Sequence, residues 1–203
     1  MLGVFYQYQK KLLKDNSKLL IIYCFFTLSI LFSYHLIEPH INLIEFGLGA
    51  INLPFNLDIL LIAQKSFYTL FLLYYTFLNS IYIFNINKAY LFFRVSKRRL
   101  SKSIFFSNIF NIVVFDFLTI ILTSLIAGFS SISFNPELLI SCFFLKISLT
   151  NLYLLTKEKT AFIIFLVPIL IIYLFYQASI ILSLVIIIIT YFIFINFIDI
   201  YDC

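Results

Sequence analysis

The sequence has very little charge. Only 11% of its 203 residues are Asp, Glu, Lys or Arg, whereas 63% are hydrophobic, and the mean hydropathy is +1.08. A soluble domain of this size needs a charged surface around its core, and so few charges cannot cover one. The composition therefore excludes an ordinary soluble protein and predicts a multi-pass protein of the cell membrane. Because backbone groups in lipid must bond within their own segment, the apolar runs are expected to be helices.

Motifs for catalysis are missing as well. None of the four glycines belongs to a phosphate-binding loop, and the chain has no HExxH motif, no CxxC pair and no serine nucleophile motif. His35, Glu38 and His40 lie close together in the sequence, but their spacing matches no established metal site. We therefore expect no catalytic residue, no metal and no cofactor bound directly by this chain, which is predicted not to be an enzyme.

What the sequence does have is a series of apolar runs. At 1.5 Å per residue, about 19 helical residues cross the ~30 Å hydrocarbon core of a bilayer. The last run, 160–198, is nearly twice that length and is expected to fold back at its polar break, 176–179. The sequence thus predicts six spans, which lie at 19–37, within 58–84, at 104–127, at 136–155, and as two helices within 160–198.

The few cations gather on one side of this predicted layout. Twelve of the 14 Lys and Arg residues lie in 1–18, 88–102 and 157–159, and none lies in a predicted outer loop. By the positive-inside rule these three segments are cytoplasmic. The predicted fold is therefore all-α, with six transmembrane helices and both termini in the cytoplasm. The cations orient the chain, so the positive net charge needs no nucleic acid as a partner.

The first 18 residues have an amphipathic pattern. Lys10, Lys11 and Lys14 lie at helical spacing on one side, and apolar residues such as Phe5 lie on the other. This pattern predicts a helix at the membrane surface that precedes a transmembrane domain of residues 19–203. The alternative interpretation is a basic flank of the first span with no structure of its own.

A strongly basic segment follows the second predicted span. Its sequence, KAYLFFRVSKRRLSK at 88–102, has six cations and no acid. As a short cytoplasmic helix it would separate an aromatic face from a basic face, which suits docking to a partner. The alternative is that the charges only orient the chain and touch anionic lipid. Within this predicted coupling segment, 86–103, the candidate docking residues are Lys88, Phe92, Phe93, Arg94, Lys97, Arg98, Arg99 and Lys102.

Two charges fall deep inside apolar sequence. Asp116 lies in the third predicted span and Lys146 in the fourth. Counted from the outer ends of these antiparallel spans, both residues lie roughly 14 to 17 Å deep. An unpaired charge at this depth is costly, so each is expected to be the other's partner, with Lys65 as a rival for Asp116. The pair would either line a translocation path or hold the two helices together.

Three features resemble the membrane subunits of ABC exporters of the type-2 permease family, especially small bacterial ones. They are the basic start FYQYQKKLLK, the segment YLFFRVSKRRLSKSIFF and the six-helix layout with both ends inside. In that family, the segment after the second span is a coupling helix that docks on a separate ATPase subunit. The family's short re-entrant helices between the last two spans have no room here at 176–179.

The resemblance implies a function and a set of partners. The chain would form the translocation path for a peptide, a lipid-like molecule or a drug-like molecule. It would pair with a second permease subunit, either a copy of itself or a related chain, and ATP and Mg would bind to the nucleotide-binding ATPase subunit.

Two other classes remain open at this stage. A membrane protein that gives immunity to a bacteriocin or another peptide would need no ATPase. The substrate-binding component of an energy-coupled importer also has about six spans, but its helix docking favours stripes of small residues, which these Phe- and Ile-rich spans lack.

Overall fold

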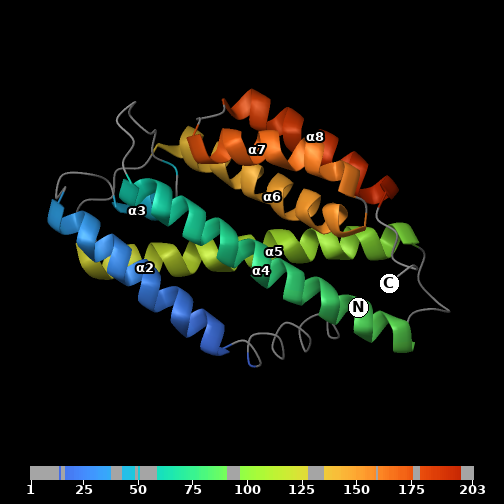
Figure 1. Ribbon diagram of the computed structural model, residues 1–203, viewed down its shortest axis with the longest axis horizontal. Coiled ribbons are helices and arrows are strands. Elements are labelled where there is room, and N and C mark those ends of the chain that lie inside the picture. Colours follow the sequence, from blue (N-terminus) through green and yellow to red (C-terminus); the bar gives the residue numbers. More distant parts are fainter. Residues whose placement is uncertain are drawn as a thin grey trace.

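Figure 1 shows the computed structural model of the chain, which is built from helices that pack side by side. The structure describes residues 14, 17–37, 43–48, 50, 59–90, 97–127, 135–158, 160–175 and 179–197. Within these ranges it leaves out the side chains of 61, 79–90, 97–100, 103, 127, 157, 158, 160, 175 and 197. The described elements are α2 (Ser17–Ile37), α3 (Leu43–Leu48), α4 (Ile59–Tyr90), α5 (Lys97–Ala127), α6 (Pro136–Glu158), a 3-10 turn η2 (Thr160–Phe162), α7 (Ile163–Phe175) and α8 (Ile180–Phe197).

The described residues confirm an all-helical protein with membrane-spanning character. Three stretches are long and apolar enough to cross a bilayer, namely Ser17–Ile37, Ile104–Ile126 and Pro136–Thr156. The predicted reversal within 160–198 is present, because α7 ends at Phe175 and α8 begins at Ile180. At 13 residues, however, α7 is only about 20 Å long, which is less than the ~30 Å hydrocarbon core.

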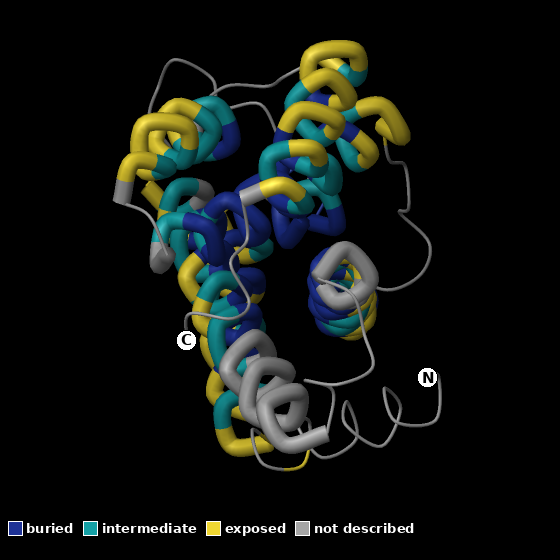
Figure 2. The backbone as a smooth tube through the Cα atoms, turned by 90° about the vertical axis from the view of Figure 1, so that its right-hand side faces the viewer, coloured by how far each residue is buried: buried dark blue, intermediate teal, exposed yellow. Residues whose placement is uncertain are grey.

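The outer surface of the bundle is apolar, unlike the surface of a soluble protein. Exposed residues lie on the outward faces of the helices and buried residues line the interior (Figure 2). The exposed residues include large apolar side chains, such as Phe25 on α2, Phe117 on α5 and Ile181 on α8, whereas Gln64 and Asn151 are fully buried. A surface of large apolar side chains, around an interior that buries polar as well as apolar residues, suits lipid and not water.

Helix α6 is the centre of the bundle. It packs against α3, α4, α5, α7 and α8, and Figure 1 shows α7 and α8 lying along it on one side with α4 and α5 on the other. Its start follows from local sequence, since Asn135 accepts a hydrogen bond at 3.0 Å through Oδ1 from the backbone N–H of Glu137. Pro136 occupies the first helical position, where the lack of an N–H costs nothing.

The structure differs from the sequence-based expectation for the basic segment. Helix α4 continues to Tyr90, and α5 begins at Lys97 and runs without a break to Ala127. Residues 97–102 are therefore the first turns of α5, and not part of a separate short helix along the membrane. The physical reason is that the sequence from Lys97 to Ala127 contains no Pro or Gly to end the helix.

Candidate functional site

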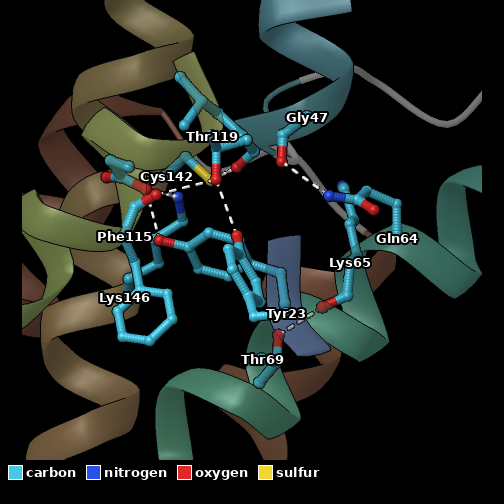
Figure 3. A network of polar contacts seen from close by, with 12 residues as sticks. Tyr23, Gly47, Gln64, Lys65, Thr69, Phe115, Thr119, Cys142 and Lys146 are labelled. Carbon is cyan, nitrogen blue, oxygen red and sulfur yellow. Dashed lines mark hydrogen bonds and ion pairs between the residues drawn. The ribbon is translucent and has the colours of Figure 1, made fainter. Parts of the chain in front are cut away.

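The two deep charges of the sequence meet inside the bundle. Lys146 Nζ on α6 lies 2.7 Å from Asp116 Oδ1 on α5. Tyr68 on α4 donates its hydroxyl proton to the same carboxylate oxygen at 2.5 Å. The Lys146 ammonium also lies 4.2 Å from the centre of the Tyr68 ring, which places it in range of a cation–π interaction. Three different helices therefore converge on one buried ion pair. Figure 3 shows Lys146 of this pair with its neighbours Tyr23, Phe115 and Thr119.

The contribution of these contacts to stability depends on how deeply the charges are buried. The side chain of Lys146 is 3% exposed and that of Asp116 is 18% exposed. Removing one partner from a buried ion pair costs about 3–5 kcal/mol, because the other charge is left uncompensated. Each partner here is held by more than one contact, as a low dielectric requires. The ion pair therefore joins α5 to α6 strongly, and a relative shift of either helix strains it.

A second polar contact lies one turn along α5. Thr119 Oγ1 donates to the backbone carbonyl of Phe115 at 2.8 Å, so Tyr23 on α2 must donate its hydroxyl proton to Thr119 across their 2.7 Å separation. The Tyr23 ring meets the rings of Phe115 and Tyr68 edge to face, at 5.0 and 6.3 Å between centroids. Four helices, α2, α4, α5 and α6, thus enclose the ion pair in aromatic side chains.

Lys65 is a third buried charge near the site. In the structure this residue is only 4% exposed. Its Nζ lies 6.0 Å from the centre of the Tyr173 ring on α7. Lys146, and not this rival candidate, is the lysine whose ammonium reaches the Asp116 carboxylate.

The short helix α3 closes one end of the site. Although it has only six residues, five of them are buried, namely Leu43, Ile44, Phe46, Gly47 and Leu48. Gln64 Nε2 on α4 donates to Gly47 O at 3.2 Å, and Cys142 Sγ on α6 donates to Leu48 O at 3.5 Å. The Phe46 and Tyr34 rings stack with 3.7 Å between centroids. We call α3 the plug, because it fills the space between α2, α4, α5 and α6.

A separate neutral contact joins α5 and α6 further along the bundle. Asn108 Nδ2 donates to Asn151 Oδ1 at 3.0 Å, and Asn151 Nδ2 donates to the carbonyl of Ile147 at 2.7 Å. Both asparagines are buried. Amide pairs of this kind hold transmembrane helices together.

The structure describes only some of the candidate residues in the basic segment and in the first 18 residues. Lys88 lies in α4, and Lys97, Arg98 and Arg99 lie in α5, where the structure describes their backbone and not their side chains. Lys102 is exposed on α5, and Lys14 is helical and exposed. Phe5, Lys10, Lys11, Phe92, Phe93 and Arg94 lie outside the described residues.

Metal binding has no support in the described part of the chain, where no three His, Cys, Asp or Glu side chains gather. His35 lies in α2, and Glu38 and His40 are outside the described residues.

Sequence reasoning missed the aromatic residues of the site. Tyr68 is one of 14 tyrosines, and none of their local patterns marks it as a carboxylate partner. The one feature of the sequence that could have indicated Tyr68 was its depth along its predicted span. Tyr68 lies near the start of α4 and Asp116 near the end of α5, so helices running in opposite directions bring the two residues to a similar level.

Comparison of the chain with protein-family models, with curated proteins and with solved structures gives no match. The residues and their arrangement are therefore the grounds on which a function is assigned.

Proposed function

We propose that the chain is the permease subunit of an ABC exporter. It crosses the cell membrane six times with both termini in the cytoplasm, and it works beside a second permease subunit. A separate ATPase subunit binds ATP and Mg and docks on the basic segment. The substrate class is a peptide, a lipid-like molecule or a drug-like molecule.

The apolar outer surface and the distribution of cations support this topology. The apolar faces of α2, α5, α7 and α8 suit a bilayer, and twelve of the 14 cations fall in the segments assigned to the cytoplasm. With this orientation, the plug and the start of α6 lie towards the outside, and the start of α5 lies towards the cytoplasm.

The continuity of α5 is the observation that carries the proposal. Its first turns hold Lys97, Arg98 and Arg99, and the same unbroken helix carries Asp116. The 19 residues from Lys97 to Asp116 correspond to about 28 Å of helix. A push or a rotation applied by a docked ATPase at the basic end would therefore reach the buried ion pair through a stiff element. A basic segment that served only to orient the chain would need no such connection.

Charge reversal in the basic segment tests the proposal. We expect the Arg98→Glu/Arg99→Glu variant, purified gently from its native cells, to lose the co-purifying nucleotide-binding subunit, because a basic docking surface would now repel its partner. Total membrane protein should stay near the level of the unaltered chain. The matched control is Lys157→Glu/Lys159→Glu, which reverses two cations at another predicted cytoplasmic turn and should retain the subunit.

Two results would contradict the exporter. One is a charge-reversed variant that keeps its ATPase subunit with hydrolysis still coupled to transport, which would leave the basic segment with an orienting role. The other is an unaltered chain that purifies with no ATPase and protects cells from a peptide toxin, which would identify an immunity protein instead.

A further inference from the structure

The plug lies one helical turn above the ion pair on every helix that builds the pair. On α4, Gln64 precedes Tyr68 by four residues and binds the plug at Gly47 O. On α6, Cys142 precedes Lys146 by four residues and binds the plug at Leu48 O. Figure 3 shows Gln64 reaching Gly47, with Cys142 and Lys146 nearby. The plug is therefore positioned by the same three helices that hold the buried charges.

The third of these helices, α5, approaches the plug closely at Gly47. A Cβ atom added to Gly47 would lie 2.8 Å from Thr123 Cγ2 and 3.0 Å from Thr119 Cγ2. Separations this short mean that α5 packs directly against the bare backbone of the plug. Because Thr119 follows Asp116 by three residues, any rotation of α5 that disturbs the ion pair also disturbs this contact.

The plug has little stability of its own. Isolated helices shorter than about 12–15 residues are marginal in water, and the plug has six residues. Its hydrogen bonds to the surrounding structure come from Gln64, from the thiol of Cys142, which is a weak donor, and from the backbone N–H of Asn135, which donates to Glu45 Oε1. The position of the plug therefore depends on its neighbours, and a shift of those neighbours releases it.

We propose that the plug is the movable outer gate of the translocation path and that α5 operates it. In the closed state the plug separates the ion pair from the outer side. When α5 shifts, the ion pair loosens, the contact at Gly47 changes and the plug withdraws, so that the buried ion pair becomes accessible from the outer side. This gate rests on the proposed function for its direction and purpose, and on the plug contacts for its existence.

Cys142 is a native reporter for the gate, because it is buried and its thiol faces the plug. In a Cys24→Ser/Cys203→Ser background it is the only cysteine of the chain. Intact cells are treated with a membrane-impermeant, cationic methanethiosulfonate reagent, and the rate of modification of Cys142 is measured. The closed gate should make this rate slow.

Two variants should open the gate by different routes. Gly47→Ala places a methyl group against α5 and wedges the plug outward. Asp116→Asn breaks the ion pair without touching the plug. We expect each variant to raise the rate of Cys142 modification by about tenfold, which corresponds to about 1.4 kcal/mol in the opening equilibrium. Ile140→Ala, a truncation on the exposed face of α6, is the control that should leave the rate unchanged.

A second reporter distinguishes gating from unfolding. Ser148 lies six residues beyond Cys142 on α6 and is fully buried, so Ser148→Cys in a background without other cysteines reports on the deeper interior. Faster modification at position 142 with no change at position 148 supports the gate. Equal increases at both positions, or a protected Cys142 in the Gly47→Ala variant, would overturn it.

If Cys142 is modified faster in Gly47→Ala but not in Asp116→Asn, the proposal that α5 couples the ion pair to the plug is wrong. The measurement needs neither an ATPase nor a substrate. If the charge-reversed variant keeps its ATPase subunit, the exporter proposal is wrong and the gate proposal is unaffected. If Cys142 stays slowly modified in the variants, the gate proposal is wrong and the exporter proposal is unaffected.

Discussion

Helices α5 and α6 are joined by two buried polar contacts, one charged and one neutral, and the two are built differently. The charged contact, between Asp116 and Lys146, has a further hydrogen bond and a cation–π contact from Tyr68. The neutral contact joins Asn108 to Asn151, and Asn108 Oδ1 has no hydrogen-bond partner among the described residues. A buried charge needs several partners, whereas a buried amide tolerates an incomplete set.

The charged and the neutral contact should respond differently to being weakened. Weakening the charged contact leaves one or both charges exposed to an apolar surrounding, so its state affects every helix that approaches it. Loss of the amide pair costs only a modest interhelical hydrogen bond. The plug contacts the helices one turn from the charged pair, as described above. Under the proposed function, the charged contact is the one that changes during transport, and the neutral contact holds the two helices together.

The largest expected effect comes from removing the carboxylate. Asp116→Ala should destabilise the protein by about 3–5 kcal/mol, because Lys146 is left as an uncompensated buried cation. The variant should accumulate poorly in membranes and unfold at lower denaturant in detergent. Lys146→Ala in the same chain should recover part of this loss, since it removes the orphaned charge.

The matched control for this pair is Ser33→Ala, at an exposed position on α2, which should leave both measurements near those of the unaltered protein. An Asp116→Ala variant with normal abundance, stability and activity would show that the ion pair contributes nothing, and the contrast between the two contacts would disappear.

A smaller effect is expected from Tyr68→Phe, which sharpens the comparison. The variant keeps the ring beneath the Lys146 ammonium and loses only the proton donated to Asp116. Hydrogen bonds to charged groups are worth about 1.5–3 kcal/mol, so the fall in unfolding free energy should lie in that range. Tyr74→Phe is the matched control on α4, because Tyr74 is 48% exposed and should be nearly neutral. Equal effects of the two variants would remove Tyr68 from the site.

The sequence predicted the charged contact more readily than its surroundings. Charged residues are rare in an apolar span, so Asp116 and Lys146 stand out, and counting from the ends of two antiparallel helices gives their depth. The structure brings them to 2.7 Å. Tyr68 and Tyr23 do not stand out in a chain that is 20% aromatic, because aromatic side chains suit both lipid-facing and buried positions of a span.

The all-helical fold and the reversal near 176–179 also followed from the apolar runs. The Gly and Pro residues of 40–56 indicated an outer loop with a short interfacial or re-entrant helix, and α3 lies there. The burial of this helix could not be predicted, because six residues with one acid show no helical period. Its burial depends on a close approach at Gly47 that only the packed structure reveals. The prediction of a separate short helix within 88–102 was wrong for residues 97–102. Amphipathic spacing does not indicate whether a helix stops or continues into the next apolar run. In α5 it continues.

The smallest expected effect is the coupling between the two asparagines. Asn108→Leu and Asn151→Leu, made singly and together, define a double-mutant cycle for the 3.0 Å hydrogen bond. We expect a coupling energy of about 0.6 kcal/mol, which is typical of interhelical hydrogen bonds in membranes. The same cycle for Asp116→Ala and Lys146→Ala should give a coupling several times larger, because each single variant there leaves a buried charge.

Unfolding free energies in detergent measure both cycles. The internal control combines Asn108→Leu with Tyr68→Phe, whose effects should add to within about 0.3–0.5 kcal/mol because the two residues share no contact. Asn108 lies eight residues from Asp116 on α5, which is about 12 Å of helix, so the neutral contact can be altered without reaching the ion pair. An asparagine coupling as large as that of the ion pair would mean that charge is not what distinguishes the two contacts. The change proposed for the ion pair would then have to involve the whole α5–α6 interface.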